Sequence, residues 1–295
     1  MSSSDVLISV CLPVRNGAST VPAVVESILA QDHANLELVI SDNASTDDTE
    51  EVCRKLVAAD DRIVYVRQPH NIGLLNNFRA AMRQASGTYA RWIGDDDWLS
   101  PECLSRCVEE FRRDDRLILV TMGMDYVGDD GVTRSAEYHG TALRSDDPID
   151  RFAEMLRLLN ESYLLIDPLY GLMRRDAIVD LPRRNMLCED QVFATKLAIA
   201  GPWSHVPQVL GRRGWRTESA STLTRRLGVP AWTAKAAFTL QGIEMRRWVD
   251  QAGLDPDQRR RAKAAVNRWY VRRQRVKIVR RSRRVARMVG LAHPR

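Results

Sequence analysis

The chain contains 295 residues, of which 44% are hydrophobic and 28% are charged, and its formal net charge is +6. This composition is typical of a globular protein and excludes a disordered chain. No apolar run approaches the roughly 18 residues that a membrane-spanning helix requires, and the first residues lack the pattern of a signal peptide. We therefore expect a cytoplasmic protein. Its cysteines show no paired metal-ligand spacing and are expected to be buried free thiols, at positions Cys11, Cys53, Cys103, Cys107 and Cys188.

Strands alternate with helices through the first hundred residues. Short apolar runs predict strands, and apolar residues at helical spacing between them predict helices. The predicted strands are residues 6–12, 36–42, 62–67 and 89–93, and the predicted helices are residues 21–29, 46–59 and 74–85. This alternation predicts a parallel, doubly wound sheet.

The second half of the chain is less regular. It is predicted to contain helices at 101–113, 150–159 and 189–199, strands at 117–122 and 164–173, and a hairpin loop at 128–131. We expect an α/β domain over residues 1–220, followed by a helical, arginine-rich extension over residues 221–295.

Polar segments follow the predicted strands of the first half. They are residues 13–16, 42–45, 71–73 and 95–97. Ligands of doubly wound sheets bind beyond the carboxyl ends of the strands. The four segments are therefore expected to converge on one crevice.

Three adjacent carboxylates, Asp95, Asp96 and Asp97, end the fourth predicted strand. Side chains packed this closely repel one another, and a hard divalent cation such as Mg²⁺ or Mn²⁺ would neutralise that repulsion. The alternative is an acidic turn that caps the helix starting near Pro101, with Ser100 as the N-cap.

The excess positive charge lies at the C-terminus, where residues 259–295 hold fifteen Lys and Arg and no Asp or Glu. An apolar stripe is predicted on this basic helix, at Val271, Ile278, Val285 and Val289. The helix is expected either to contact an anionic membrane surface or, as a slightly favoured alternative, to pack its stripe on the preceding domain. Nucleic-acid binding is unlikely because no reading motif accompanies the charge.

Five polar motifs follow one another along the chain. They are Pro13-Val14-Arg15-Asn16, residues 41–47, Asn71-Ile72-Gly73, residues 85–89 leading into the three aspartates, and Glu189-Asp190. In order and approximate spacing, the set resembles family 2 glycosyltransferases of the GT-A fold over residues 5–216. The resemblance implies a Rossmann-like, mostly parallel central sheet with helices on both faces.

The resemblance also implies an activity. Such an enzyme is inverting and transfers a sugar from a nucleotide-sugar donor, with UDP slightly favoured, to an acceptor hydroxyl. The acceptor would be a saccharide, a lipid-linked saccharide or a natural product, and the cofactor would be Mn²⁺ or Mg²⁺. The enzyme would lie in the cytoplasm or at the inner membrane surface.

Each motif carries an expected role by this resemblance. Asp42 is expected to bind the nucleoside, which Pro13, Val14, Arg15 and Asn16 border. Asn71 and Gly73 would shape a loop near the donor. Asp97 is the expected metal ligand, with Asp95 or Asp96 reaching the ribose or a second metal contact. Asp190, beside Glu189, is the expected general base. The residues expected to face the leaving diphosphate are Arg212, Arg213, Trp215 and Arg216.

Simpler roles remain open for the same residues. Asp42 would serve equally in turn hydrogen bonds, Glu189 and Asp190 in favouring a helix N-terminus, and the arginines in a solvated loop. Two other functions are also open. A sugar-phosphate nucleotidyltransferase would share the fold but should carry a glycine-rich basic loop after the first strand, of which residues 13–18 are a poor version. A non-enzymatic, basic nucleic-acid-binding protein would leave the acidic motifs unexplained.

Overall fold

A nine-stranded mixed sheet forms the centre of the molecule, in the order β3-β2-β1-β4-β8-β6-β9-β5, with β7 paired to β6. The computed structural model describes the backbone of residues 6–162, 164–215 and 218–288, and side chains as far as residue 275. The strands are β1 (Ile8–Val14), β2 (Leu36–Asp42), β3 (Ile63–Arg67), β4 (Tyr89–Trp92), β5 (Trp98–Leu99), β6 (Leu119–Gly128), β7 (Thr133–Arg134), β8 (Leu172–Arg174) and β9 (Trp203–Trp215).

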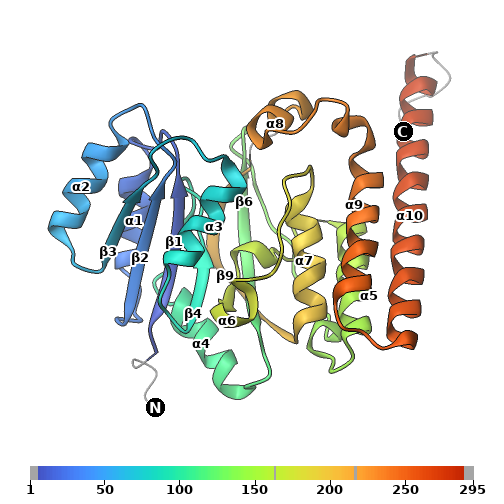
Figure 1. Cartoon of the computed structure of the whole chain (residues 1–295), viewed down its shortest axis with the longest axis horizontal. Helices are drawn as coiled ribbons and strands as arrows, with labels where there is room; N and C mark the ends of the chain where they lie inside the picture. The colour runs from blue at the N-terminus through green and yellow to red at the C-terminus, as the bar shows by residue number, and fades with distance from the viewer. Residues whose placement is uncertain (1–5, 163, 216–217, 289–295) are drawn as a thin grey trace.

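The first four strands are parallel, as predicted. Beyond them the sheet is mixed, because β8 runs antiparallel to both β4 and β6 while β9 runs parallel to β6. The predicted α/β fold with helices on both faces of a central sheet is therefore confirmed (Figure 1), although the sheet is mixed and not mostly parallel.

Helices cover both faces of this sheet. They are α1 (Val21–Leu29), α2 (Thr49–Ala59), α3 (Leu74–Gln84), α4 (Cys103–Arg113), α5 (Pro148–Glu161), α6 (Arg175–Ile178) and α7 (Glu189–Ala200), with the 3₁₀ turns η1 (Ala142–Arg144) and η2 (Pro168–Tyr170). Alternate residues of β1 enter different clusters: Ile8, Val10 and Leu12 pack with α1 and α4, whereas Cys11 packs with α3 and α7. Burial on both faces explains why this strand is apolar throughout.

Two local predictions are wrong. The strand expected at 164–173 is instead the turn η2 followed by the three-residue strand β8. Pro168 lacks an N–H group for a sheet hydrogen bond and starts the turn. The alternative in which Ser100 caps α4 is also wrong, because the helix begins at Cys103 and the Ser100 hydroxyl has no hydrogen-bond partner in the described part of the chain.

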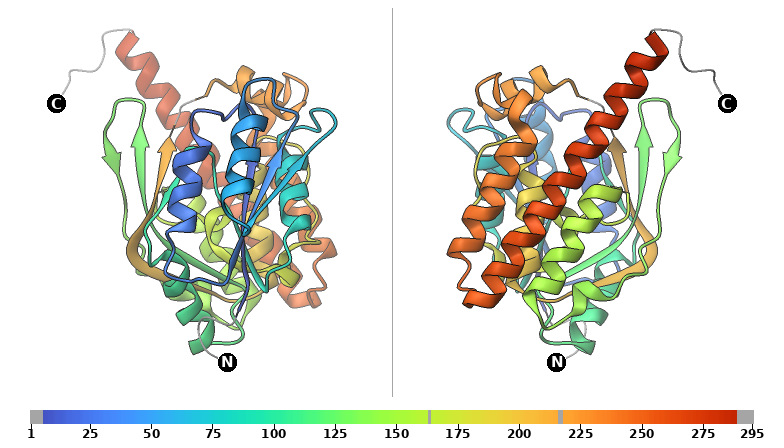
Figure 2. Two further views of the ribbon diagram at one scale, coloured as in Figure 1. Left: turned by 90° about the vertical axis from the view of Figure 1, so that its left-hand side faces the viewer. Right: turned by 90° about the vertical axis from the view of Figure 1, so that its right-hand side faces the viewer.

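Three helices form the C-terminal extension: α8 (Ala220–Leu227), α9 (Thr233–Gln251) and α10 (Pro256–Met288). Figure 2 shows α10 lying across α5 and α9. The extension shares one apolar cluster with α5 and α7, to which α10 contributes Ala262, Ala265, Val266 and Trp269. The packed alternative is therefore the observed arrangement.

The predicted apolar stripe on α10 is wrong at Val271, the one member whose side chain the structure describes. Val271 is 50% exposed, because the buried face follows Ala262, Val266 and Trp269. The side chains of Ile278 and Val285, and the whole of Val289, lie outside the described residues. Among the helices that the structure describes, none combines the length and apolarity needed to span a bilayer.

Candidate active site

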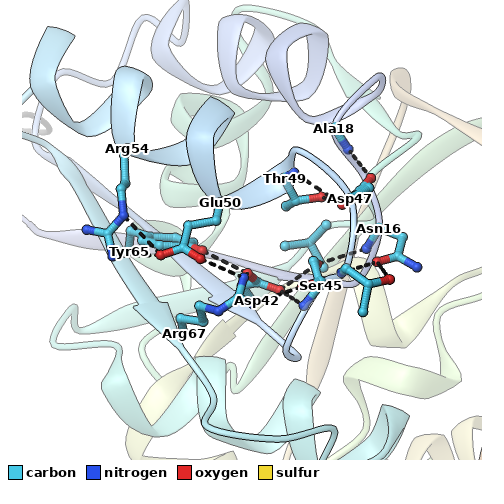
Figure 3. A network of polar contacts seen from close by, with 12 residues as sticks. Asn16, Ala18, Asp42, Ser45, Asp47, Thr49, Glu50, Arg54, Tyr65 and Arg67 are labelled. Atoms are coloured by element: carbon cyan, nitrogen blue, oxygen red, sulfur yellow. Dashed lines mark hydrogen bonds and ion pairs between the residues drawn. The ribbon is translucent and has the colours of Figure 1, made fainter.

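The loops that follow β1 and β2 are hydrogen-bonded to each other (Figure 3). The Asn16 amide donates to the Ser45 hydroxyl at 2.9 Å, and the Asn16 side-chain oxygen accepts from the Thr46 amide at 2.8 Å. Asn16 adopts the left-handed backbone conformation, with φ of 59°, which asparagine tolerates better than most residues. Two of the predicted polar segments are thus joined at the carboxyl edge of the sheet.

Asp42 lies at the centre of this network and is fully buried. Its carboxylate accepts hydrogen bonds from the Ser45 amide and hydroxyl, from the Tyr65 hydroxyl at 2.7 Å and from the Arg67 guanidinium at 2.9 Å (Figure 3). The role in turn hydrogen bonds is therefore confirmed. A nucleoside contact would have to replace one of these donors, and it stays a prediction.

The side chains of the loop after β1 differ in their exposure to solvent. Pro13 and Val14 are buried and can border a ligand only through their backbone, whereas Arg15 is exposed beside them.

The loop between β3 and α3 joins the same edge. Asn43 donates to Asn71 at 2.9 Å and accepts from the Ile72 amide at 2.8 Å. Asn71 also accepts from the Gly73 amide, and Gly73 is the N-cap residue of α3, with φ of 87°. Three of the four polar segments are therefore connected by hydrogen bonds, as the convergence prediction requires.

The three aspartates after β4 have different surroundings. Asp95 packs against Gly17 of the β1 loop, so the fourth segment also reaches this edge. Asp96 is exposed and lies against Gly214 of β9. Asp97 is buried, and its Oδ2 atom accepts from the Gly94 amide at 2.8 Å. Burial raises the pKa of Asp97 to about 6, despite the opposing charge of Arg213.

A cluster around Arg213 completes this part of the site. Its guanidinium pairs with Asp167 at 2.5 Å, stacks on the ring of Tyr170 at 3.6 Å, and lies 3.4 Å from Asp97. Tyr126 donates a longer hydrogen bond to Asp167, at 3.4 Å. Sequence reasoning missed Asp167, although an acidic residue before Pro168 inside an apolar run was a signal against a strand.

Glu189 and Asp190 begin α7 but have separate roles. Glu189 is buried and forms a two-pronged ion pair with Arg183, with contacts of 2.8 and 2.5 Å. Asp190 is accessible to solvent. Desolvation of its carboxylate by the surrounding protein, together with the charges of Glu189 and Asp167, raises its pKa to about 6. The negative charge of Asp167 also helps to raise the pKa of Asp97.

The remaining predicted residues lie on β9. Arg212 is exposed and pairs across the strands with Trp98, its guanidinium 5.7 Å from the centre of the indole ring. Trp215 packs edge-on against Tyr126. Arg216 lies outside the described residues.

The sequence model described as "Glycosyl transferase family 2" matches residues 9–181, more than half of the chain. The chain belongs to glycosyl transferase family 2. This membership makes it a glycosyltransferase, in place of the sugar-phosphate nucleotidyltransferase and of the non-enzymatic protein considered above.

Curated relatives of this family 2 glycosyltransferase match part of the chain. Chondroitin synthase of Pasteurella multocida is 34% identical over 125 residues, which are 42% of this chain and 13% of that protein. The GalNAc(5)-diNAcBac-PP-undecaprenol beta-1,3-glucosyltransferase of Campylobacter jejuni is 30% identical over 145 residues, which are 49% of this chain and 46% of that protein. The matched region is thus less than half of either relative.

Solved structures share the fold. S. aureus TarS 1–349 in complex with UDP-GlcNAc has a TM-score of 0.65 at 17% identity, covering 89% of this chain and 72% of the other. The mannosyltransferase PcManGT from Pyrobaculum calidifontis, in complex with GDP-Man and Mn²⁺, has a TM-score of 0.51 at 15% identity, covering 90% and 85%. The GT-A fold of this family 2 glycosyltransferase is therefore shown.

The residues present fit one type of divalent-cation site, in which the phosphates of the substrate supply some of the ligands. In the described residues, no three His, Cys, Asp or Glu side chains are grouped as a ligand set. Mg²⁺ and Mn²⁺ at nucleotide sites are often held by one or two carboxylates together with the substrate's phosphates. Asp97 fits such a site, since its buried Oδ1 atom has no hydrogen-bond partner among the described residues.

Proposed function

We propose that this protein is an inverting glycosyltransferase that transfers a sugar from a nucleoside diphosphate donor to an acceptor hydroxyl, with Asp190 as general base and Asp97 as metal ligand. The observation that carries the proposal is the contrast between two carboxylates of this family 2 chain: Asp97 is buried after β4, whereas Asp190 is open to solvent in the first turn of α7. An ion site and a base are the two groups that an inverting displacement requires.

Asp190 is the stronger candidate for the base. Its neighbour Glu189 forms an ion pair with Arg183 and has little exposed surface, so it is a poor proton acceptor. Asp190 is accessible, and a pKa of about 6 makes its carboxylate more basic than an ordinary aspartate while leaving it ionised at neutral pH. Glu189 and Arg183 would then act by fixing the first turn of α7.

The donor would lie at the carboxyl edge of β1, β2 and β4. Asp42 holds Arg67 and Ser45 in place, and the exposed Arg15 stands at the same edge. Asp97, with Asp95 or Asp96, would hold a divalent cation that neutralises the charge developing on the departing diphosphate. Arg212 is exposed on the neighbouring strand β9 and is proposed to bind that diphosphate, with Arg216 beyond it in sequence.

We favour UDP-sugars as donors and a saccharide hydroxyl as acceptor. The UDP-GlcNAc complex of TarS supports the donor, while the GDP-Man complex of PcManGT keeps guanosine open. The Campylobacter jejuni relative, whose printed name includes an undecaprenol-linked saccharide, supports a lipid-linked acceptor. Such an acceptor would bring the enzyme to a membrane surface, and the exposed arginines of α10 offer it a basic face.

The test is a screen of UDP- and GDP-sugars with the purified chain, measuring release of the nucleoside diphosphate with Mn²⁺ and with EDTA. We expect slow, Mn²⁺-dependent release from one donor class. Once an acceptor is found, NMR of the product should show an anomeric configuration opposite to that of the donor. Retention of configuration would contradict the inverting mechanism, and release that is unaffected by EDTA would contradict the role of the metal.

A further inference from the structure

The guanidinium of Arg213 is the positively charged group beside Asp97. Its Nε atom lies 3.4 Å from the Asp97 Oδ1 atom, and within the described parts of the chain neither atom has a hydrogen-bond partner. The two groups therefore attract through charge alone. The other Asp97 oxygen is already held by the Gly94 amide, so Oδ1 is the atom with lone pairs to offer.

The opposite end of the guanidinium is held more firmly. Its Nη1 atom donates to the Asp167 Oδ2 atom at 2.5 Å, and its face rests on the Tyr170 ring at 3.6 Å. Tyr126 donates to the same Asp167 oxygen. Arg213 is thus hydrogen-bonded to Asp167 and lies close to Asp97 without a hydrogen bond to it. A small movement of the guanidinium away from Asp97 would leave its ion pair with Asp167 intact.

We propose that Arg213 is the resident counter-cation of Asp97, that its guanidinium would leave Asp97 when that carboxylate holds a divalent cation, and that Asp167 would then retain the guanidinium. The inference rests on the metal-assisted function proposed above. Its physical basis is that a buried carboxylate beside two other acidic groups needs a compensating charge at every stage. Arg213 and Asp167 would then be positioning residues that set the affinity of the site for metal.

Two other roles make different predictions. If Arg213 only stabilised the fold, its removal would lower the melting temperature without improving metal binding. If Arg213 bound the donor diphosphate directly, its removal would weaken the binding of UDP in EDTA and leave metal affinity unchanged. Displacement from Asp97 instead predicts that metal binds more tightly once the guanidinium is gone.

The experiment measures Mn²⁺ binding to the full chain by the electron paramagnetic resonance signal of free Mn²⁺, with and without UDP. Arg213→Met should bind Mn²⁺ more tightly than the parent protein, on the order of tenfold. Asp167→Asn should bind it more weakly, because Arg213 is left with Asp97 as its charged partner. Arg213→Lys, which keeps the charge, should stay near the parent. Arg247→Met removes an exposed arginine of α9 and controls for net charge.

A double variant excludes one other explanation. In Arg213→Met the freed Asp167 carboxylate could itself bind the ion, but Arg213→Met with Asp167→Asn removes that ligand. The gain in affinity should persist in the double variant, and its loss would overturn the inference. Circular dichroism checks folding. If Arg213→Met does not fold, Arg213→Gln replaces it, and Asp167→Asn still tests the opposite change, weaker binding of Mn²⁺.

Equal Mn²⁺ affinity in the parent, Arg213→Met and Asp167→Asn proteins would also overturn the inference, whether that affinity is measurable or absent in all three. The proposed function is tested separately, by measuring how EDTA changes the donor turnover of the parent protein. Turnover that needs Mn²⁺ while the affinities stay equal would defeat the role of Arg213 alone. Turnover that is indifferent to EDTA would defeat the metal-assisted mechanism, whatever the binding series shows.

Discussion

At the scale of single residues, the raised pKa of Asp190 makes activity depend on pH. A pKa of about 6 means that the carboxylate gains a proton as the pH falls through that value, and a protonated acid cannot accept the acceptor's proton. We expect kcat/KM to fall about tenfold for each pH unit below 6, and more steeply if Asp97 is protonated in the same range. A pH–rate profile measures this, and a flat profile from pH 5 to 8 would contradict it.

Replacing the base should affect chemistry more than binding. Asp190→Asn keeps the shape of the side chain but removes its basicity, so transfer should fall by about 10²–10⁴-fold while the affinity for UDP is retained. Steady-state kinetics and calorimetric titration with UDP measure the two effects. Asp61→Asn, at an exposed position after α2, is the matched control and should be unchanged. Full transfer by Asp190→Asn would rule out its role as base.

Contacts of single residues could be predicted only where the two partners lie close together in the sequence. The position of Asp190 in the first turn of a helix could be predicted from the helical run that follows it, whereas its role as base comes from the order of the motifs and stays a prediction. The Tyr65 and Arg67 donors around Asp42 could not be predicted, because these side chains reach it only once β3 pairs with β2. The contact between Arg213 and Asp167 spans 46 residues and likewise exists only in the folded chain.

At the scale of elements, two glycines should respond to the same substitution with opposite signs. Gly73 is the N-cap residue of α3, with φ of 87° and open space around it, so Gly73→Ala should lower the free energy of unfolding by about 1–2 kcal/mol through backbone strain alone. Gly242 lies inside α9, where an added β-carbon would meet Trp269 at an ordinary 3.6 Å. Gly242→Ala should therefore raise the free energy of unfolding by about 0.5–1 kcal/mol. Denaturant unfolding measures both, and equal signs would contradict the backbone argument.

Elements were predictable where one local rule sufficed. The first four strands and the helices between them follow from apolar spacing, and their bounds differ from the predicted ones by a few residues at most. The run at 164–173 was misread because apolar composition alone does not separate a buried strand from a buried turn. The single proline within that run was the informative residue.

At the scale of the whole molecule, the alternation of strands and helices predicted where the site would lie, but not how the C-terminal extension attaches. The convergence of the loops follows from the parallel order of β1, β2 and β4. The buried face of α10 depends on apolar partners on α5, α7 and α9, which are distant in the sequence. The proposed boundary near residue 220 stays a prediction, because the extension shares a core with the catalytic part.

That shared core leads to a test of whether the two parts unfold together. Trp269 is 2% exposed in the cluster that joins α10 to α5 and α7, whereas Val271, two residues further on, is 50% exposed. Trp269→Ala should cost about 3–5 kcal/mol and lower the melting temperature by roughly 10 °C, while Val271→Ala should change it little. Because α7 carries Asp190 and shares this cluster, calorimetry of the Trp269→Ala protein should show a single transition, and UDP with Mn²⁺ should raise its temperature. Two separate transitions, with the ligand raising only one of them, would show instead that the extension folds independently of the site.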